Sequence, residues 1–325
     1  MRVERFEIEI QEGALKDLKD RLNRTRWPDE LEGVNWEYGT SLQAVKNLAS
    51  YWESDFNWRE QERQLNTFPH FIADVDDQRI HFIHARGTGP SPLPLIISHG
   101  WPGSFAEMVK IIPLLTDPAR YGGDPMDAFD VVVPSLPGYG FSDHPTKRGI
   151  SPFRIAELWK QLMHGLGYER FAAQGGDFGA SVSTCLGYSF PNNIIGVHLN
   201  FIPGSFKPPL DDAERPLSEA ERIYVATHAA WVSDEGGYGH IQATKPQTLT
   251  YGLNDSPAGL AAWMIEKFRS WSDCNGDIET VFSRDELLTN ISIYWFTETI
   301  GSSMRLYAET RQRPLSFTRG ERVTG

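Results

Sequence analysis

One short stretch, Gly175-Gly176-Asp177-Phe178-Gly179, constrains the fold of this chain more than any other. The apolar residues 171–173 before it are typical of a buried strand, and residues 180–183 after it are typical of the first turn of a helix. Glycines at 175, 176 and 179 allow a sharp strand-to-helix turn with close packing. The stretch therefore predicts an α/β arrangement in which Asp177 stands at the carboxyl end of a parallel strand.

This layout is that of a nucleophile elbow, a strained turn that holds one reactive side chain above the end of a strand. An aspartate at this position would attack an alkyl carbon and form a carboxylic ester, which water must then break. Such chemistry indicates an electrophilic sp3 carbon, as in an epoxide or an alkyl halide, rather than an ester or amide substrate. The structural alternative is a glycine turn in which Asp177 only caps the following helix.

Composition excludes several classes of partner. The 325 residues carry a formal charge of −12, which disfavours nucleic acid and anionic membrane surfaces as partners. The only two cysteines, Cys185 and Cys274, show no metal or redox spacing, which indicates a reducing, cytoplasmic compartment and no metal site. No stretch approaches about 20 consecutive apolar residues, so we expect a soluble protein without a membrane anchor.

The order of apolar runs predicts a parallel sheet preceded by a helical arm and interrupted by a helical lid. The expected arm has an alternating strand through Phe6, Ile8 and Ile10, followed by helices over residues 14–27 and 41–56. A hairpin is expected next, with strands 71–75 and 79–84. Strands then alternate with helices. The expected strands are 93–98, 129–133, 171–173 and 194–199, and the expected helices are 105–115, 152–166, 285–299 and 302–313.

Several ordered motifs together make the chain resemble the epoxide hydrolases of the microsomal type, which have the α/β-hydrolase fold. The juvenile-hormone epoxide hydrolases share the same pattern. The resemblance implies an N-terminal arm and first hairpin over residues 1–90, an α/β-hydrolase core over 91–202, a helical lid over 203–300, and a return to the core over 301–325. The motifs are His99-Gly100-Trp101-Pro102-Gly103-Ser104, Pro137-Gly138-Tyr139-Gly140-Phe141-Ser142, the elbow, residues 237–246, residues 253–257, Tyr294-Trp295 and Met304-Arg305-Leu306-Tyr307.

The resemblance implies a reaction that needs only a small epoxide and water, with no cofactor, and that yields a vicinal diol. Asp177 would form the alkyl-enzyme ester, and the lid residues Tyr238 and Tyr307 would protonate the leaving oxygen. A phenol with an ordinary pKa of about 10 is protonated at neutral pH and can donate that proton. The backbone N–H groups of Trp101 and Phe178 would stabilise the oxyanion formed during ester hydrolysis.

Ester hydrolysis in this fold also needs an acid and a histidine after the nucleophile in the sequence. The later histidines are His198 in the expected fourth strand and His228 and His240 in the lid, and Asn200 occupies one position where an acid is found. The family pattern places the missing pair beyond residue 325. We therefore expect a C-terminally truncated chain that accumulates an ester on Asp177 and exposes an unpaired edge strand.

Two other functions stay open at this point. A haloalkane-type dehalogenase also uses an elbow aspartate, but it needs N–H donors to the halide, and the phenyl ring of Phe178 has none. A catalytically inactive relative that only binds ligands would explain the missing histidine. His99, beside the first loop, is expected to be a structural hydrogen-bonding residue. The sequence does not decide the oligomeric state and leaves a homodimer open.

Overall fold

A mixed sheet forms the centre of the computed structural model, which describes residues 1–202, 216–317 and 321–323. In the described part of the chain the sheet has seven strands in the order β1-β2-β3-β5-β4-β6-β7. Strands β5, β4, β6 and β7 run parallel to one another, and β1, β2 and β3 add to one side in antiparallel pairs. The strands are β1 Val3–Phe6, β2 His70–Val75, β3 Gln78–Ala85, β4 Leu93–Ser98, β5 Phe129–Pro134, β6 Phe171–Gly175 and β7 Ile194–Leu199.

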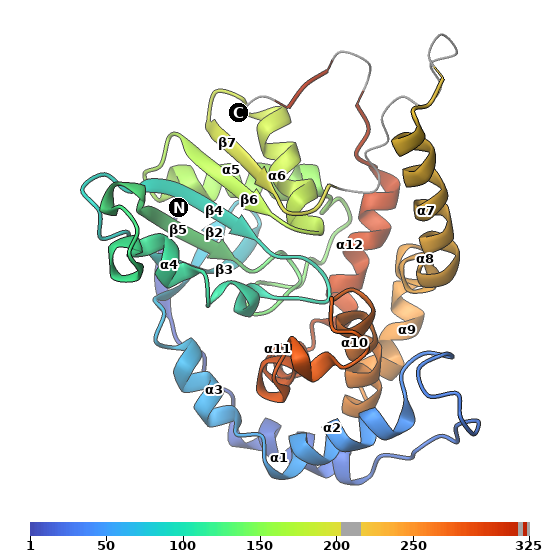
Figure 1. Ribbon diagram of the computed structural model, residues 1–325. Coiled ribbons are helices and arrows are strands. Elements are labelled where there is room, and N and C mark those ends of the chain that lie inside the picture. The colour runs from blue at the N-terminus through green and yellow to red at the C-terminus, as the bar shows by residue number, and fades with distance from the viewer. Residues whose placement is uncertain (203–215, 318–320, 324–325) are drawn as a thin grey trace.

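Helices surround this sheet and form a second layer beside it (Figure 1). The α-helices are α1 Glu12–Asn23, α2 Leu42–Ser54, α3 Trp58–Leu65, α4 Ile112–Thr116, α5 Pro152–Gly165, α6 Phe178–Ser189, α7 Glu219–Glu235, α8 Gly237–Thr244, α9 Pro246–Leu253, α10 Pro257–Ser270, α11 Arg284–Thr297 and α12 Ile300–Gln312. Short 3-10 helices are η1 Phe105–Met108, η2 Pro118–Tyr121, η3 Pro125–Asp127 and η4 Ile278–Thr280.

The parallel strands are confirmed where the sequence predicted them, and β4 and β7 have the predicted bounds. Their apolar runs are buried because helices cover both faces of a parallel sheet. Val131, Val132 and Val133 of β5 are fully buried, as this arrangement requires. The predicted hairpin is also confirmed: Val75 of β2 pairs with Gln78 of β3 across a tight turn.

The N-terminal arm packs against the helical layer rather than standing alone. In Figure 1, α10 and α11 lie between the sheet and helices α1 and α2. The indole nitrogen of Trp52 in α2 donates a buried hydrogen bond to Ser292 Oγ of α11 at 3.0 Å. The Tyr51 hydroxyl donates to the Asp285 carboxylate of α11 at 2.9 Å. These bonds connect the arm to helices that follow it by more than two hundred residues.

The expectation of a strand through Ile8 and Ile10 is wrong, because β1 ends at Phe6. The two backbone N–H groups donate to side chains of the arm instead. Ile8 donates to Asn66 Oδ1 at 2.9 Å and Ile10 donates to Glu62 Oε1 at 2.7 Å. Because these side chains accept the hydrogen bonds of the two backbone N–H groups, the segment through Ile8 and Ile10 does not need to pair with another strand.

The predicted helix over residues 105–115 is two short helices, η1 and α4. Pro113 lacks a backbone N–H and is tolerated only near a helix start, so the chain begins a new helix there. Residues 216–283 are mainly helical, as expected for a lid, and residues 203–215 lie outside the described residues. The expected approach to a further strand over 319–325 falls partly outside the described residues, and residues 321–323 are irregular.

The four proposed segments stay a prediction. Strands from the first 90 residues share one sheet with the later strands, and α12 packs against α8 and α9 of the lid.

Close packing of backbone explains the glycines of the elbow. A Cβ on Gly179 would lie 1.9 Å from the carbonyl oxygen of Ser98 at the end of β4, and a Cβ on Gly175 would lie 2.1 Å from the Gly179 backbone. The first turn of α6 therefore rests directly on the neighbouring strand, which fixes the height of Asp177 above the sheet.

We expect Gly179→Ala to destabilise the fold by about 1–3 kcal/mol or more, because backbone atoms of β4 cannot move aside for the new methyl group. Gly13→Ala is the matched control, since nothing lies within 4 Å of its added Cβ in α1. The control is expected to be neutral or slightly stabilising. Urea unfolding of the three proteins measures both effects. Equal midpoints for the two variants would show that the contact at Ser98 is unimportant.

Candidate active site

Asp177 has the strained backbone expected of an elbow residue. Its φ of 50° and ψ of −123° place a non-glycine residue in a region that favours glycine. Its carboxylate accepts a hydrogen bond from the backbone N–H of Trp101 at 3.0 Å. Burial raises the pKa of Asp177, and the backbone N–H groups of Trp101 and Phe178 lower it in part. The backbone N–H groups of the two predicted oxyanion donors therefore both face the Asp177 carboxylate.

Helix α11 holds the loop that carries Trp101. Asn290 Nδ2 donates to the carbonyl oxygen of Pro102 at 2.7 Å, and the Tyr294 hydroxyl donates to that of Gly103 at 2.7 Å. Both interactions are buried, so water does not compete with them. Because two consecutive carbonyl groups are fixed on one side of the loop, the Trp101 N–H on its other side keeps its direction toward Asp177.

The two predicted tyrosines lie together beside Asp177, although they come from different helices. Tyr238 belongs to α8 and Tyr307 to α12, and their ring centroids are 5.8 Å apart. The ring of Tyr238 stacks on Trp101, with centroids 5.4 Å apart and planes 11° apart. The ring of Tyr307 meets Phe178 edge-on at 4.7 Å. Each phenol thus contacts a residue whose backbone N–H faces the Asp177 carboxylate.

Burial and the charge of Asp177 raise the pKa of both phenols well above the ordinary value of 10. The two phenols also influence each other, because their rings lie side by side in the same buried space. The Tyr307 hydroxyl oxygen is buried and makes no hydrogen bond of normal geometry to the described residues. A buried hydroxyl without such a partner is costly, so it is available to a ligand.

His99 has the structural, hydrogen-bonded environment that the sequence predicted. His99 is buried; its Nε2 accepts from the backbone N–H of Leu136 at 3.1 Å, and its Nδ1 contacts the carbonyl oxygen of Gly100 at 3.0 Å. Burial lowers the pKa of His99 to about 4, which keeps the ring neutral. The other histidines singled out from the sequence lie on β7 (His198), between Tyr224 and Trp231 on α7 (His228), and on α8 (His240).

Two charged residues near the site were missed by sequence reasoning. The carboxyl of Glu107 in η1 lies over Gly103, where an added Cβ would be 2.1 Å from Oε2. Loss of hydration and the charge of Asp177 raise the pKa of Glu107 to about 8. Lys267 of α10 is buried against Tyr238. Both read as ordinary surface charges in the sequence, and only the tertiary packing brings them here.

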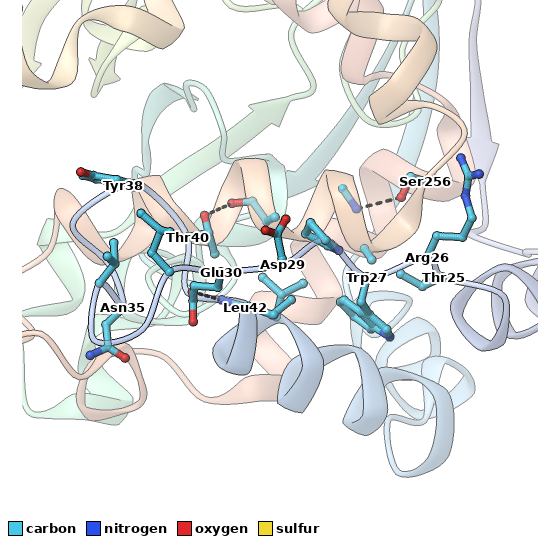
Figure 2. A pocket seen from close by; sticks show the side chains of 17 residues that line it. Thr25, Arg26, Trp27, Asp29, Glu30, Asn35, Tyr38, Thr40, Leu42 and Ser256 are labelled. Atoms are coloured by element: carbon cyan, nitrogen blue, oxygen red, sulfur yellow. Dashed lines mark hydrogen bonds between the residues drawn. The ribbon is translucent and has the colours of Figure 1, made fainter.

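A separate pocket of about 470 Å³ lies between residues 25–40, the start of α2 and α10 (Figure 2). Its polar groups serve the backbone rather than a reaction. Glu30 accepts from the N–H of Leu42 at 2.7 Å, Thr40 donates to the carbonyl of Ala262 at 2.7 Å, and Ser256 caps α10 by accepting from Gly259. We therefore place the candidate active site at Asp177 and not in this pocket.

No group of three or more His, Cys, Asp and Glu side chains among the described residues is placed to hold a metal ion. None of the helices in the described ranges combines the length and the apolar character needed to cross a membrane.

Comparison with known protein families and structures gives consistent matches. Residues 3–108 match the family described as epoxide hydrolase N terminus, and residues 94–224 match the alpha/beta hydrolase fold family. The chain is 46% identical over 304 residues to a putative epoxide hydrolase of Stigmatella aurantiaca, covering 94% of this chain and 68% of that protein. It is 38% identical over 345 residues to epoxide hydrolase 1 of Oryctolagus cuniculus, covering 98% and 75%.

Solved structures give the same result. The juvenile hormone epoxide hydrolase of the silkworm Bombyx mori matches with a TM-score of 0.80 and 34% identity, over 95% of this chain and 76% of that one. The epoxide hydrolase of Aspergillus niger matches with a TM-score of 0.83 and 31% identity, over 96% of this chain and 80% of that one.

Proposed function

This chain belongs to the epoxide hydrolase family and has the α/β-hydrolase fold, and on that premise we propose that Asp177, Tyr238 and Tyr307 open the epoxide ring. The observation that carries the proposal is the convergence of two phenols and two backbone N–H groups on one carboxylate. These relatives do not favour a haloalkane-type dehalogenase or an inactive binding protein.

In the proposed first step, an oxygen of the Asp177 carboxylate attacks one ring carbon and forms a C–O bond. The bond between that carbon and the ring oxygen breaks, and the electron pair stays on the oxygen. A phenol then transfers its proton to this alkoxide, which becomes the hydroxyl of a bound ester. We assign this proton transfer to Tyr238, whose ring stacks on Trp101. Tyr307 donates a hydrogen bond to the same oxygen.

In the proposed second step, water attacks the carbonyl carbon of the ester, and the negative charge moves to the carbonyl oxygen. Collapse of this intermediate breaks the bond between the acyl carbon and the alkyl oxygen, restores the Asp177 carboxylate and releases the diol. Of the two protons of the water, one goes to the departing diol oxygen and the other restores the phenol that was ionised in the first step. The N–H groups of Trp101 and Phe178 stabilise this oxyanion, since both already point at the carboxyl group of Asp177. Loss of one such donor typically costs about 10²–10³ in rate.

We infer that the substrate carries an apolar or aromatic substituent next to the epoxide. Four aromatic rings surround the reacting groups: those of Trp101, Tyr238, Trp271 and Tyr307. Trp271 stands at the end of α10 and contacts Tyr238, with ring centroids 5.0 Å apart. Such walls favour flat apolar groups over charged ones.

The proposal predicts a covalent adduct with an aryl epoxide such as styrene oxide. We expect a rapid acid quench to trap a protein whose mass has increased by that of the whole epoxide, with the modification on the peptide that contains Asp177. The product released is the vicinal diol. An alkyl chloride of similar size serves as the comparison and is expected to release no chloride. Chloride release without diol formation, or an adduct on another residue, would contradict the proposal.

A further inference from the structure

Lys267 is a buried cation next to the proposed proton donor, and the reaction as described above does not use it. Its side chain is only 7% exposed and forms ion pairs with Glu235 at 3.1 Å and Glu266 at 2.6 Å. Lysine is rarely buried to this extent unless it is paired. Two carboxylates therefore stabilise an ammonium group that the fold keeps away from bulk water.

The ammonium lies against the aromatic rings of the site. Its Nζ is 5.0 Å from the ring centroid of Tyr238 and 5.6 Å from that of Trp271. Both distances are within the range of a cation–π interaction, which grows stronger when the cation is desolvated. Glu235 is the last residue of α7, and α8, which carries Tyr238, begins at Gly237. The Lys267 side chain thus contacts both the residue that ends α7, Glu235, and the Tyr238 ring of α8.

We propose that Lys267 is a positioning residue that orients the Tyr238 ring and favours proton transfer from its hydroxyl. This inference rests on the proposed role of Tyr238. A cation over the ring attracts electron density, so it stabilises the negative charge that Tyr238 gains as the proton leaves. The same contact restrains the ring against Trp101 and keeps the hydroxyl directed at Asp177.

The charged and titratable groups around Tyr238 do not all act in one direction. The negative charges of Asp177 and Glu235 oppose ionisation of the phenol and raise its pKa, and the Tyr307 hydroxyl lowers it. The positive charge of Lys267 favours ionisation. The two partners of one ion pair, Lys267 and Glu235, are therefore expected to act on proton transfer with opposite sign. A purely structural ion pair would not distinguish them.

The test measures the first-order rate of adduct formation with styrene oxide in three variants. We expect Lys267→Met to slow this rate by about tenfold through loss of the cation–π contact. Glu235→Gln should leave the rate unchanged or raise it up to about threefold, since Glu266 still pairs with Lys267. Lys267→Arg keeps the charge and should recover most of the rate. Lys110→Met, at an exposed ion pair with Glu286, is the control and should have no effect.

A double-mutant cycle tests whether Lys267 acts through the Tyr238 hydroxyl. In a Tyr238→Phe background, Lys267→Met should cost less than about twofold, because the group it assists is already absent. An undiminished tenfold loss in that background would overturn the inference. So would equal losses in Lys267→Met and Glu235→Gln, which would indicate a structural role alone. Far-ultraviolet circular dichroism and melting temperatures confirm that each variant is folded.

These experiments distinguish a failure of the inference about Lys267 from a failure of the proposed function. If the unmodified protein forms no adduct on Asp177, the proposed function fails. If it forms the adduct at a rate that Lys267→Met does not change, only the inference about Lys267 fails. The Lys267→Met/Glu235→Gln double variant removes both charges of the pair, so it covers the case in which an unpaired Glu235 alone unfolds the protein. It should again be about tenfold slow, and full activity in that variant would overturn the inference.

Discussion

Replacing Asp177 with glycine abolishes the covalent adduct and lowers diol formation by at least about 10⁴-fold, if this carboxylate is the nucleophile. The same change is expected to raise the melting temperature. At φ 50° and ψ −123° an aspartate is strained by about 1–3 kcal/mol, and glycine adopts this conformation freely. Loss of a buried carboxylate adds to the gain. If the Asp177→Gly variant is more stable but inactive, the backbone strain at Asp177 is retained because activity requires it.

The control for this prediction is Asp76→Gly. Asp76 also has a positive φ, 55°, but it lies in the β2–β3 turn and pairs with Arg154 on α5. We expect this variant to keep the full rate of adduct formation. Intact mass spectrometry after an acid quench measures the adduct, and calorimetry measures the melting temperature. An adduct formed at the normal rate in Asp177→Gly would assign the nucleophile to another residue.

The sequence predicted the elements whose identity is decided locally. Strands β4 and β7 are short apolar runs bounded by polar or glycine residues, and runs of six residues are too short to suggest a helix. The elbow was predicted because only glycine fits where Gly175 and Gly179 approach neighbouring backbone, so the spacing of small residues carries the geometry. Tyr238 and Tyr307 were not evident from their own surroundings. Their proposed role came from the family resemblance, and in the structure both lie close enough to Asp177 for its charge to raise their pKa values.

The features that the sequence did not reveal depend on contacts between distant segments. Helix α3 was missed because it is short and polar. It is stabilised by the burial of Trp58 and Leu65, and the Trp58 ring packs against Phe296 of α11. The strand through Ile8 failed because the Asn66 side chain takes the backbone bond that a strand would need. Lys267 lies on a helix with other charges, and its burial follows only from the position of Glu235 at the end of another helix.

Replacing both phenols is the second large change that we expect. Tyr238→Phe and Tyr307→Phe should each slow adduct formation by about 10²-fold, since each removes one phenol from the leaving oxygen. The double variant should be slowed by about 10³–10⁴-fold, because the alkoxide then forms without a proton donor. Tyr121→Phe, an exposed tyrosine on η2, is the control and should have no effect. Quenched-flow measurement of the adduct gives all four rates.

The pH dependence of adduct formation separates the nucleophile from the acids. Asp177 must be ionised to attack, and burial raises its pKa above 3.8, so the rate should fall on the acid side at a higher pH than for a free carboxyl. The phenols must be protonated, and their raised pKa values keep them so beyond pH 10, the ordinary value. We therefore expect the phenols to cause no decline of the rate up to about pH 10. Ionisation of Glu107, whose pKa is raised to about 8, is the one other step expected in this range, and it should be absent in Glu107→Gln. The double phenylalanine variant should keep the same acid limb at a much lower rate, since Asp177 is unchanged. A decline of the rate below pH 9 that persists in Glu107→Gln would mean that the proton that reaches the alkoxide comes neither from Tyr238 nor from Tyr307.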